Sequence, residues 1–139
     1  MNKTFLYVHA IWAVAEKAAV LSKPIRSVLF AHLKKNADEK GIRVLEVNGG
    51  EDHVHVLVSL HPAQNLSQVI RQLRAETSDW LNATQLLPEE FHWAEDYMAY
   101  SVSPGALKQV IQYLERQEEY HKTKTLDAEL EVFDVNVEK

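Results

Sequence analysis

The chain has 139 residues, of which 46% are hydrophobic and 25% are charged, and it contains no cysteine. This composition is typical of one globular domain, and it excludes a disordered or fibrous chain, a disulfide framework and a thiolate metal site. No apolar run approaches the roughly 20 residues that span a bilayer, so we expect no membrane partner. The chain starts without a signal-peptide layout, so we expect a cytoplasmic protein.

Charge is distributed unevenly along the chain, whose formal net charge is −5. Residues 1–75 hold 10 basic and 6 acidic side chains, whereas residues 76–139 hold 5 basic and 14 acidic ones. A polyanion can therefore meet a basic face on the first half. We divide the chain into a single domain over residues 1–125 and an acidic tail over residues 126–139.

The first half of the chain predicts three strands and one helix. Residues 5–14 are rich in β-branched and aromatic side chains and predict a strand. A helix over residues 22–41 begins with a serine N-cap and a proline in its first turn, and it ends at a glycine. Strands are predicted over residues 42–47 and 52–60, and the Asn-Gly-Gly sequence at 48–50 indicates a hairpin turn between them.

The second half adds two helices and a strand. Asn65 or Ser67 can cap a helix that runs to about Asn82. A short strand follows over residues 97–102, and Ser-Pro-Gly then opens a last helix over residues 103–121. The order β-α-β-β-α-β-α predicts an α+β, ferredoxin-like fold, in which two helices cover one face of an antiparallel sheet and a C-terminal helix is added.

The third predicted strand carries a His-Val-His sequence at His53 and His55. Residues two apart on a strand point to the same face, so the two imidazoles project side by side while the valines between and after them face the core. Two imidazoles on a rigid strand make two of the three ligands of a metal site. The alternative is chance, because a short His-x-His sequence has a high rate of false matches.

Tyr113 and Gln117 lie four residues apart on the last predicted helix and therefore share a helix face. A tyrosine can act as a nucleophile toward a phosphoryl group. A glutamine can add a neutral oxygen to the two histidines, and such a set suits Mg²⁺ or Mn²⁺ with open positions. The alternative interpretation is that Tyr113 is an amphipathic residue half-buried by the helix and that Gln117 lies on the surface.

Several sequence blocks follow one another in order over most of the chain, from about residue 4 to residue 124. They are Tyr7–Ala13, Gly41–Arg43, Val47–His55, Trp80, Phe91–Trp93, Tyr97 with Ser101–Ser103, and Tyr113–His121. In this order the blocks resemble the single-tyrosine HUH transposases of bacterial insertion sequences, and especially their REP-associated branch.

The resemblance implies a role for each candidate residue. Tyr113 matches the nucleophilic tyrosine, and Gln117 matches the third ligand of a divalent metal ion, Mg²⁺ or Mn²⁺. His53 and His55 match the two histidines of the motif that gives the class its name. The implied substrate is single-stranded DNA with an imperfect hairpin, which is cut and rejoined through a 5′-phosphotyrosine. Family members are dimers in which the tyrosine helix can complete the partner's site, so we expect a homodimer.

Two features bear on DNA binding. Glu76 and Asp79 stand on the second predicted helix, where this family tends to be basic, and they would repel a phosphate backbone. Five basic side chains on the two long predicted helices are candidates for a phosphate-binding face, although solvated helix charges explain them almost equally well. These candidates are Arg26, Lys34, Lys35, Arg71 and Arg74.

Other polar and aromatic residues have simpler interpretations. We interpret His9 as a core or surface histidine rather than a neighbour of the histidine pair. We interpret Asp52 as an acid at the start of a strand rather than a partner that orients His53. The tryptophans at positions 12, 80 and 93 can stack on bases, but packing is their more common use.

Two other functions compete with a transposase. One is a dimeric module that grips hairpin DNA, with catalysis weakened by the acidic substitutions; a domesticated, non-mobile relative with the transposase chemistry is a separate, closer variant. The other is a metal-dependent phosphodiesterase acting on small substrates, which would usually need a second histidine motif. His92 and His121 do not have the neighbours that such a motif requires.

Overall fold

The computed structural model describes residues 2–117. The four strands of this part form one antiparallel sheet in the order β2-β3-β1-β4. The strands are β1 (Tyr7–Ala13), β2 (Arg43–Gly49), β3 (His53–Ser59) and β4 (Met98–Val102). This connectivity is the ferredoxin-like α+β arrangement, so the predicted fold class is confirmed. The predicted acidic tail lies outside the described residues.

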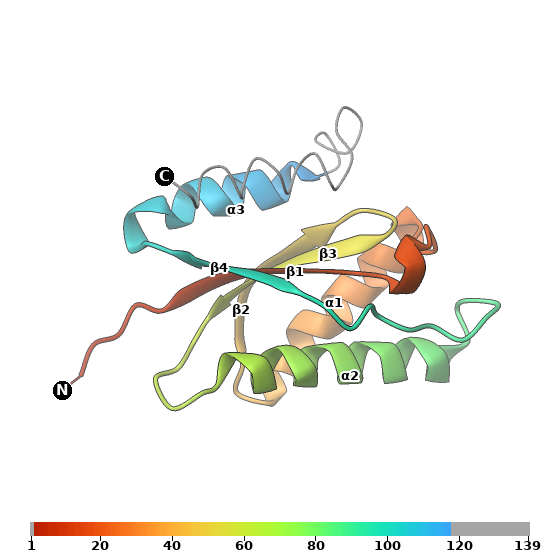
Figure 1. The fold of residues 1–139 in the computed structure, drawn as a ribbon, viewed down its shortest axis with the longest axis horizontal. Helices are drawn as coiled ribbons and strands as arrows, with labels where there is room; N and C mark the ends of the chain where they lie inside the picture. The colour runs from red at the N-terminus through yellow and green to blue at the C-terminus, as the bar shows by residue number, and fades with distance from the viewer. Residues whose placement is uncertain (1, 118–139) are drawn as a thin grey trace.

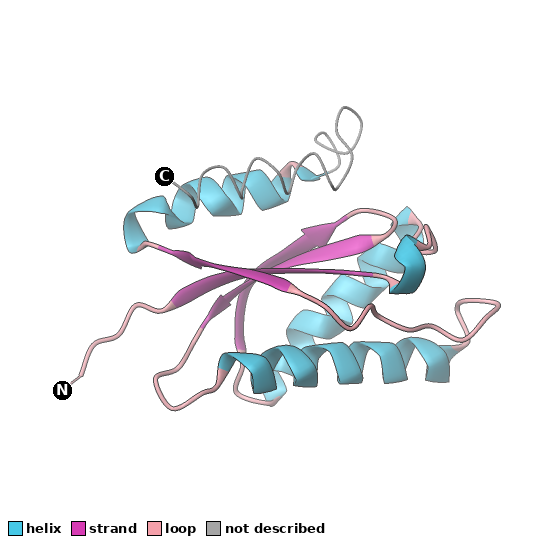
Figure 2. Ribbon diagram, viewed as in Figure 1, coloured by secondary structure: helices cyan, strands magenta, loops and turns pink. Residues whose placement is uncertain are grey.

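The sheet separates the helices into two layers (Figure 1). The two long helices run below the sheet and the third lies above it, and a long loop joins α2 to β4 (Figure 2). The helices are α1 (Lys23–Glu39), α2 (Leu66–Thr84) and α3 (Leu107–Glu115), with short 3₁₀ turns η1 (Ala15–Lys17) and η2 (Pro104–Ala106). No helix in the described part of the chain is long and apolar enough to cross a membrane.

Strand β3 has a different chemistry on each of its faces. Val54, Val56 and Val58 point toward α1 and α2 and belong to the main hydrophobic core. The alternating residues His53, His55 and Leu57 point the other way, and Leu57 packs with the apolar face of α3. All six of these side chains are at most 1% exposed, so β3 is buried on both faces.

The hairpin between β2 and β3 turns later than the sequence predicts. Asn48 and Gly49 belong to β2, and the turn falls at residues 50–52. Gly49 is needed for close approach of the two strands, because a Cβ atom there would overlap the carbonyl oxygen of His53 and lie 2.9 Å from the Cα of Val54. The first glycine of the predicted Asn-Gly-Gly turn is therefore a contact point between the two strands of the hairpin.

The helix ends agree with the sequence in most places. Asn65 caps α2 by accepting a hydrogen bond from the backbone N–H of Gln68 at 3.3 Å. Gly41 ends α1 with a φ of +75°, the left-handed conformation that glycine adopts without strain. Regular helix in α3 ends at Glu115, and the part of the last predicted helix beyond Gln117 lies outside the described residues.

Candidate active site

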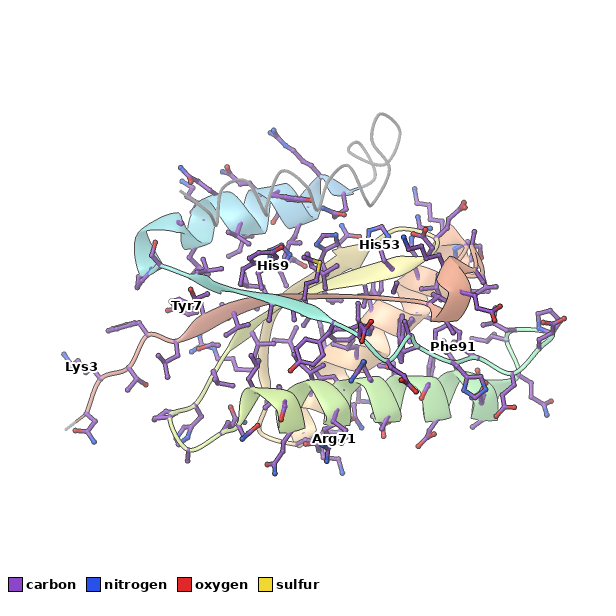
Figure 3. The ribbon with its side chains drawn as sticks, viewed as in Figure 1. Lys3, Tyr7, His9, His53, Arg71 and Phe91 are labelled. Atoms are coloured by element: carbon purple, nitrogen blue, oxygen red, sulfur yellow. The ribbon has the colours of Figure 1, made fainter. Side chains whose placement is uncertain are left out.

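The two histidines of β3 lie side by side between the sheet and α3. Their ring centroids are 5.1 Å apart with the ring planes at 74°, and the side chains of His53 and His55 are 1% and 0% exposed. Figure 3 labels His53 in this layer together with His9, which comes from β1. The shared face predicted from the two-residue spacing is therefore present, and both rings are fixed in a rigid central strand.

Each ring of the pair is held at its Nδ1 atom. The Nδ1 of His53 lies 2.7 Å from the carboxylate Oδ1 of Asp52. The Nδ1 of His55 lies 2.9 Å from the Nε2 of His9. The interpretation of Asp52 as a simple strand-entry acid is therefore wrong, because its carboxylate is placed to orient the neighbouring ring.

His9 is a buried histidine, as predicted for a core residue. The prediction that it does not neighbour the histidine pair is wrong, because it contacts His55. It reaches His55 because β1 and β3 are hydrogen-bonded neighbours in which His9 stands opposite Leu57, one diagonal step from His55. Its side chain is 2% exposed, and burial lowers its pKa from 6.5 to about 4. His9 is therefore a neutral imidazole at physiological pH, with one donor and one acceptor nitrogen.

Tyr113 reaches the same place from α3 of the same chain. Its ring centroid lies 5.8 Å from that of His55 and 6.2 Å from that of His9. The helix brings it there because its apolar residues repeat at helical spacing and pack on the upper face of the sheet. These residues are Leu107, Val110, Ile111 and Leu114.

Gln117 is fully buried, at 0% exposure. The alternative interpretation that placed this residue on the surface is therefore wrong. The spacing argument assumed one continuous helix, whereas Arg116 is a C-cap with φ −104° and ψ 19°. A break in the regular helix thus lies between Tyr113 and Gln117.

Asn48 was missed as a residue of this region. It stands opposite His55 on β2, and its side-chain Nδ2 donates a hydrogen bond of 2.7 Å to the backbone carbonyl oxygen of Leu114. That carbonyl lies in the last turn of α3, where it also receives the backbone N–H of the C-cap Arg116. The bond ties the end of α3 to the sheet one residue after Tyr113.

The donor atoms of this region fit a divalent metal ion if Gln117 supplies an oxygen ligand beside the two histidines. Among residues 2–117, no group of three or more histidine, aspartate and glutamate side chains converges in a way that would hold a metal. An ion beside His53 and His55 would therefore need a neutral oxygen, and the buried amide of Gln117 is the candidate. Since both Nδ1 atoms face protein partners, the Nε2 atoms are the candidate coordinating nitrogens.

Comparison with known proteins supports the family that the sequence blocks suggested. The model of the family described as "Transposase IS200 like" matches residues 2–117. The chain belongs to this family of IS200-like transposases. The ISDra2 transposase TnpA of Deinococcus radiodurans is 28% identical over 114 residues, which cover 78% of this chain and 81% of that protein.

Two solved structures share the fold of this IS200-like transposase. One is a putative transposase from Deinococcus radiodurans, with a TM-score of 0.68, 22% identity, and coverage of 84% of this chain and 93% of that one. The other is a REP-associated tyrosine transposase bound to a REP hairpin, with a TM-score of 0.63 and 10% identity. It covers 87% of this chain and 73% of that one.

The basic residues predicted to bind phosphate are not equivalent in this transposase. Arg26 donates to the carbonyl oxygen of Leu21 at 2.8 Å. Arg74 donates to the carbonyl oxygens of Ala94 and Glu95 at 3.0 and 2.8 Å. These two arginines hold loops in place. The other three are exposed, and all five stand on α1 and α2, across the sheet from the histidine pair, where Figure 3 labels one of them. The exposed three are Lys34, Lys35 and Arg71.

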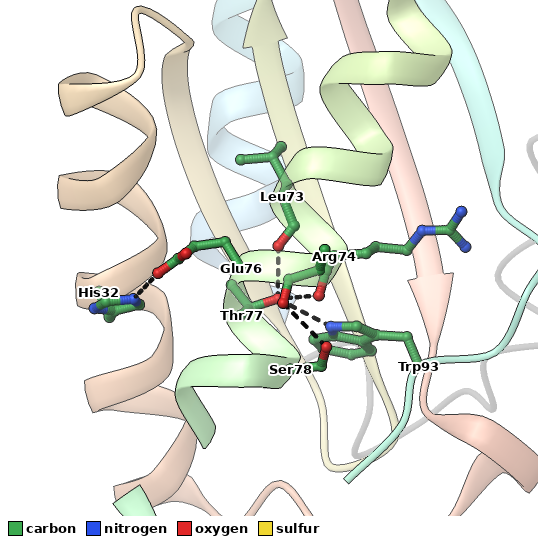
Figure 4. A network of polar contacts seen from close by, with 8 residues as sticks. His32, Leu73, Arg74, Glu76, Thr77, Ser78 and Trp93 are labelled. Atoms are coloured by element: carbon green, nitrogen blue, oxygen red, sulfur yellow. Dashed lines mark hydrogen bonds and ion pairs between the residues drawn. The ribbon is translucent and has the colours of Figure 1, made fainter. Parts of the chain in front are cut away.

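One of the two acids expected to repel DNA has a partner within the protein. Glu76 accepts a hydrogen bond from, or pairs with, the Nε2 of His32 at 3.0 Å, and this contact joins α2 to α1 (Figure 4). Asp79 is exposed on α2. Glu76 therefore links the two long helices, whereas Asp79 has no such role in the described contacts.

The tryptophans pack within the protein, as predicted. Trp12 is buried in the core at 2% exposure. Trp93 donates its indole N–H to the hydroxyl of Thr77 at 2.9 Å (Figure 4), and Trp80 stacks on His32 with ring centroids 4.3 Å apart.

Proposed function

We propose that this IS200-like transposase cuts and rejoins single-stranded DNA through Tyr113. The observation that carries the proposal is the position of the Tyr113 ring, whose centroid lies 5.8 Å from that of His55. His55 is one of two neighbouring buried imidazoles whose Nδ1 atoms contact other side chains. A phenol beside such a pair has what a phosphoryl-transfer nucleophile needs, which is a fixed position and neighbouring groups able to hold a cation.

The proposed reaction exchanges one phosphoester for another. The Tyr113 oxygen attacks the phosphorus of the scissile phosphodiester as the phenolic proton passes to a water molecule that enters with the substrate. The bond from phosphorus to the 3′ oxygen breaks, and that oxygen takes up a proton to become a free 3′-hydroxyl. The 5′ end remains on the tyrosine. Attack by a 3′-hydroxyl on this phosphotyrosine reverses the exchange and restores the strand, so no ATP is required.

His53, His55 and Gln117 are the proposed ligands of Mg²⁺ or Mn²⁺. When bound, such an ion supplies a Lewis acid that polarises an oxygen of the scissile phosphate. The protein's own contribution is to orient the ligands, and the contacts of Asp52 and His9 with the two Nδ1 atoms do this. The two imidazole nitrogens and one amide oxygen leave open positions for substrate.

We propose hairpin-bearing DNA as the substrate, with the exposed side of α1 and α2 as a phosphate-binding surface. One structure with this fold is that of a REP-associated tyrosine transposase bound to a REP hairpin. Lys34, Lys35 and Arg71 are exposed cations of that side, and contacts of this kind make DNA affinity fall as salt rises. We also propose a homodimer, which light scattering coupled to gel filtration measures directly.

Cleavage and binding can be separated by removing a single hydroxyl group. We expect Tyr113→Phe to bind a hairpin oligonucleotide with unchanged affinity and to lose cleavage in Mn²⁺. Tyr100→Phe is the matched control, because that ring also stands near His9, at 6.4 Å. Loss of cleavage in the control alone would contradict the assignment of the nucleophile. A wild-type protein that shifts the DNA on a native gel but never cuts it would support a hairpin-binding module instead.

A further inference from the structure

The contact between His9 and His55 has a consequence for metal binding, and it rests on the proposed function of the histidine pair. A neutral imidazole carries its single proton on either nitrogen. His55 can coordinate a metal through Nε2 only when its proton is on Nδ1. In that tautomer the atom 2.9 Å away, His9 Nε2, must be an acceptor.

The fold makes this pairing rigid. β1 and β3 are the two central strands of the sheet, and their register places His9 opposite Leu57 and His55 opposite Ile11. The two imidazoles are therefore diagonal neighbours on the same face, a spacing that ring side chains can bridge. Both are at most 2% exposed, so their hydrogen bond lies in a low-dielectric interior where a misplaced proton is costly.

We propose that His9 is a positioning residue that selects the Nδ1–H tautomer of His55 and so presents His55 Nε2 to the divalent ion. Asp52 acts in the same way on His53, whose Nδ1 lies 2.7 Å from the Asp52 Oδ1. An ionised carboxylate, however, can only accept a hydrogen bond. His9 can accept or donate, so its own tautomer decides whether His55 is able to bind a metal. The site is thus coupled to β1, a strand that carries none of the proposed ligands.

The test compares two substitutions of His9 with a distant control. His9→Leu keeps an apolar side chain in the core and removes the acceptor. His9→Gln places an amide oxygen near the position of Nε2 and restores it. His92→Leu removes an exposed histidine of the segment before β4. Mn²⁺ affinity is measured by calorimetry on each metal-free protein after circular dichroism has confirmed its fold.

We expect His9→Leu to weaken Mn²⁺ binding by about 10- to 100-fold, the usual effect of removing a partner of a ligating histidine. His9→Gln should recover most of that affinity, and His92→Leu should bind like the wild type. Equal Mn²⁺ affinity in His9→Leu and the wild type would overturn the positioning role alone. A wild-type protein that binds no Mn²⁺ would instead overturn the proposed metal site, and the role of His9 with it.

A second measurement does not depend on any variant. Nitrogen-15 NMR of the histidine rings reports which nitrogen is protonated. In the Mg²⁺-loaded wild-type protein we expect His55 to carry its proton on Nδ1 and His9 to be unprotonated at Nε2. A proton on the Nε2 of His9 under these conditions would contradict the proposal, even if His9→Leu failed to fold.

Discussion

Replacing Asn48 with alanine would test whether the end of α3 is held in place by one hydrogen bond. The asparagine Nδ2 donates to the carbonyl oxygen of Leu114 at 2.7 Å. Such a bond contributes about 0.5–1.5 kcal/mol net, and a buried carbonyl left without a donor costs about 1–3 kcal/mol. Because the Leu114 carbonyl keeps the Arg116 N–H as a donor, we expect Asn48→Ala to destabilise the end of α3 by only about 1 kcal/mol.

That value is small beside the apolar contact that attaches α3 to the sheet. Leu114 is 0% exposed, and truncating a buried leucine to alanine costs about 2–5 kcal/mol. Asn48→Ala should therefore leave α3 attached but raise the population of its opened end about fivefold. Tyr113, one residue before that carbonyl, still lies beside His55 whenever the end of α3 is closed, so the rate of DNA cleavage should fall by much less than fivefold while the opened end is a minor population.

Hydrogen–deuterium exchange over α3 measures this opening directly. Asn36→Ala on α1 is the control, because it removes the same amide group on the far side of the sheet. We expect faster exchange in α3 for Asn48→Ala only, with a melting temperature close to that of the wild type. Unchanged exchange in α3 would refute the view that this bond positions the tyrosine.

Two further substitutions test the packing beneath the site. Gly49→Ala should distort the β2–β3 hairpin and lower the melting temperature, because the new Cβ would overlap the carbonyl oxygen of His53, whereas Gly105→Ala meets nothing within 4 Å and should not. Equal melting temperatures for the two variants would contradict the inference that β2 and β3 approach closely at Gly49. Thr77→Val removes the oxygen that accepts the Trp93 indole N–H at 2.9 Å. Urea unfolding should show a loss of about 1–3 kcal/mol, and no loss would mean that the indole finds another acceptor.

The sequence predicted the fold because its signals are local. Alternating valines on β3, the glycine that ends α1 and the asparagine that caps α2 each act within a few residues. The shared face of His53 and His55 followed from the same strand periodicity. The turn between β2 and β3 was predicted too early, because a glycine chosen for close strand contact looks the same in a sequence as a glycine chosen for a turn.

The contacts that complete the candidate site depend on register, which periodicity alone does not give. His9 is 46 positions from His55 in the chain, and Asn48 is 66 positions from Leu114. Nothing near either residue signals its partner. The register of β1 against β3 was needed to find the first contact, and the packing of α3 on the sheet was needed to find the second. The sequence shows only that His9 lies on the first predicted strand, which does not indicate its contact with His55.

The most direct measurement of the central claim is to locate the covalent bond. The protein would be incubated with a labelled single-stranded hairpin oligonucleotide from its own genomic flanks in Mn²⁺, digested, and analysed by mass spectrometry. We predict a nucleotide adduct on the peptide that contains Tyr113, absent when EDTA is present and absent from Tyr113→Phe. An adduct on another residue, or one that forms equally well in EDTA, would contradict the proposed nucleophile or the proposed metal requirement respectively.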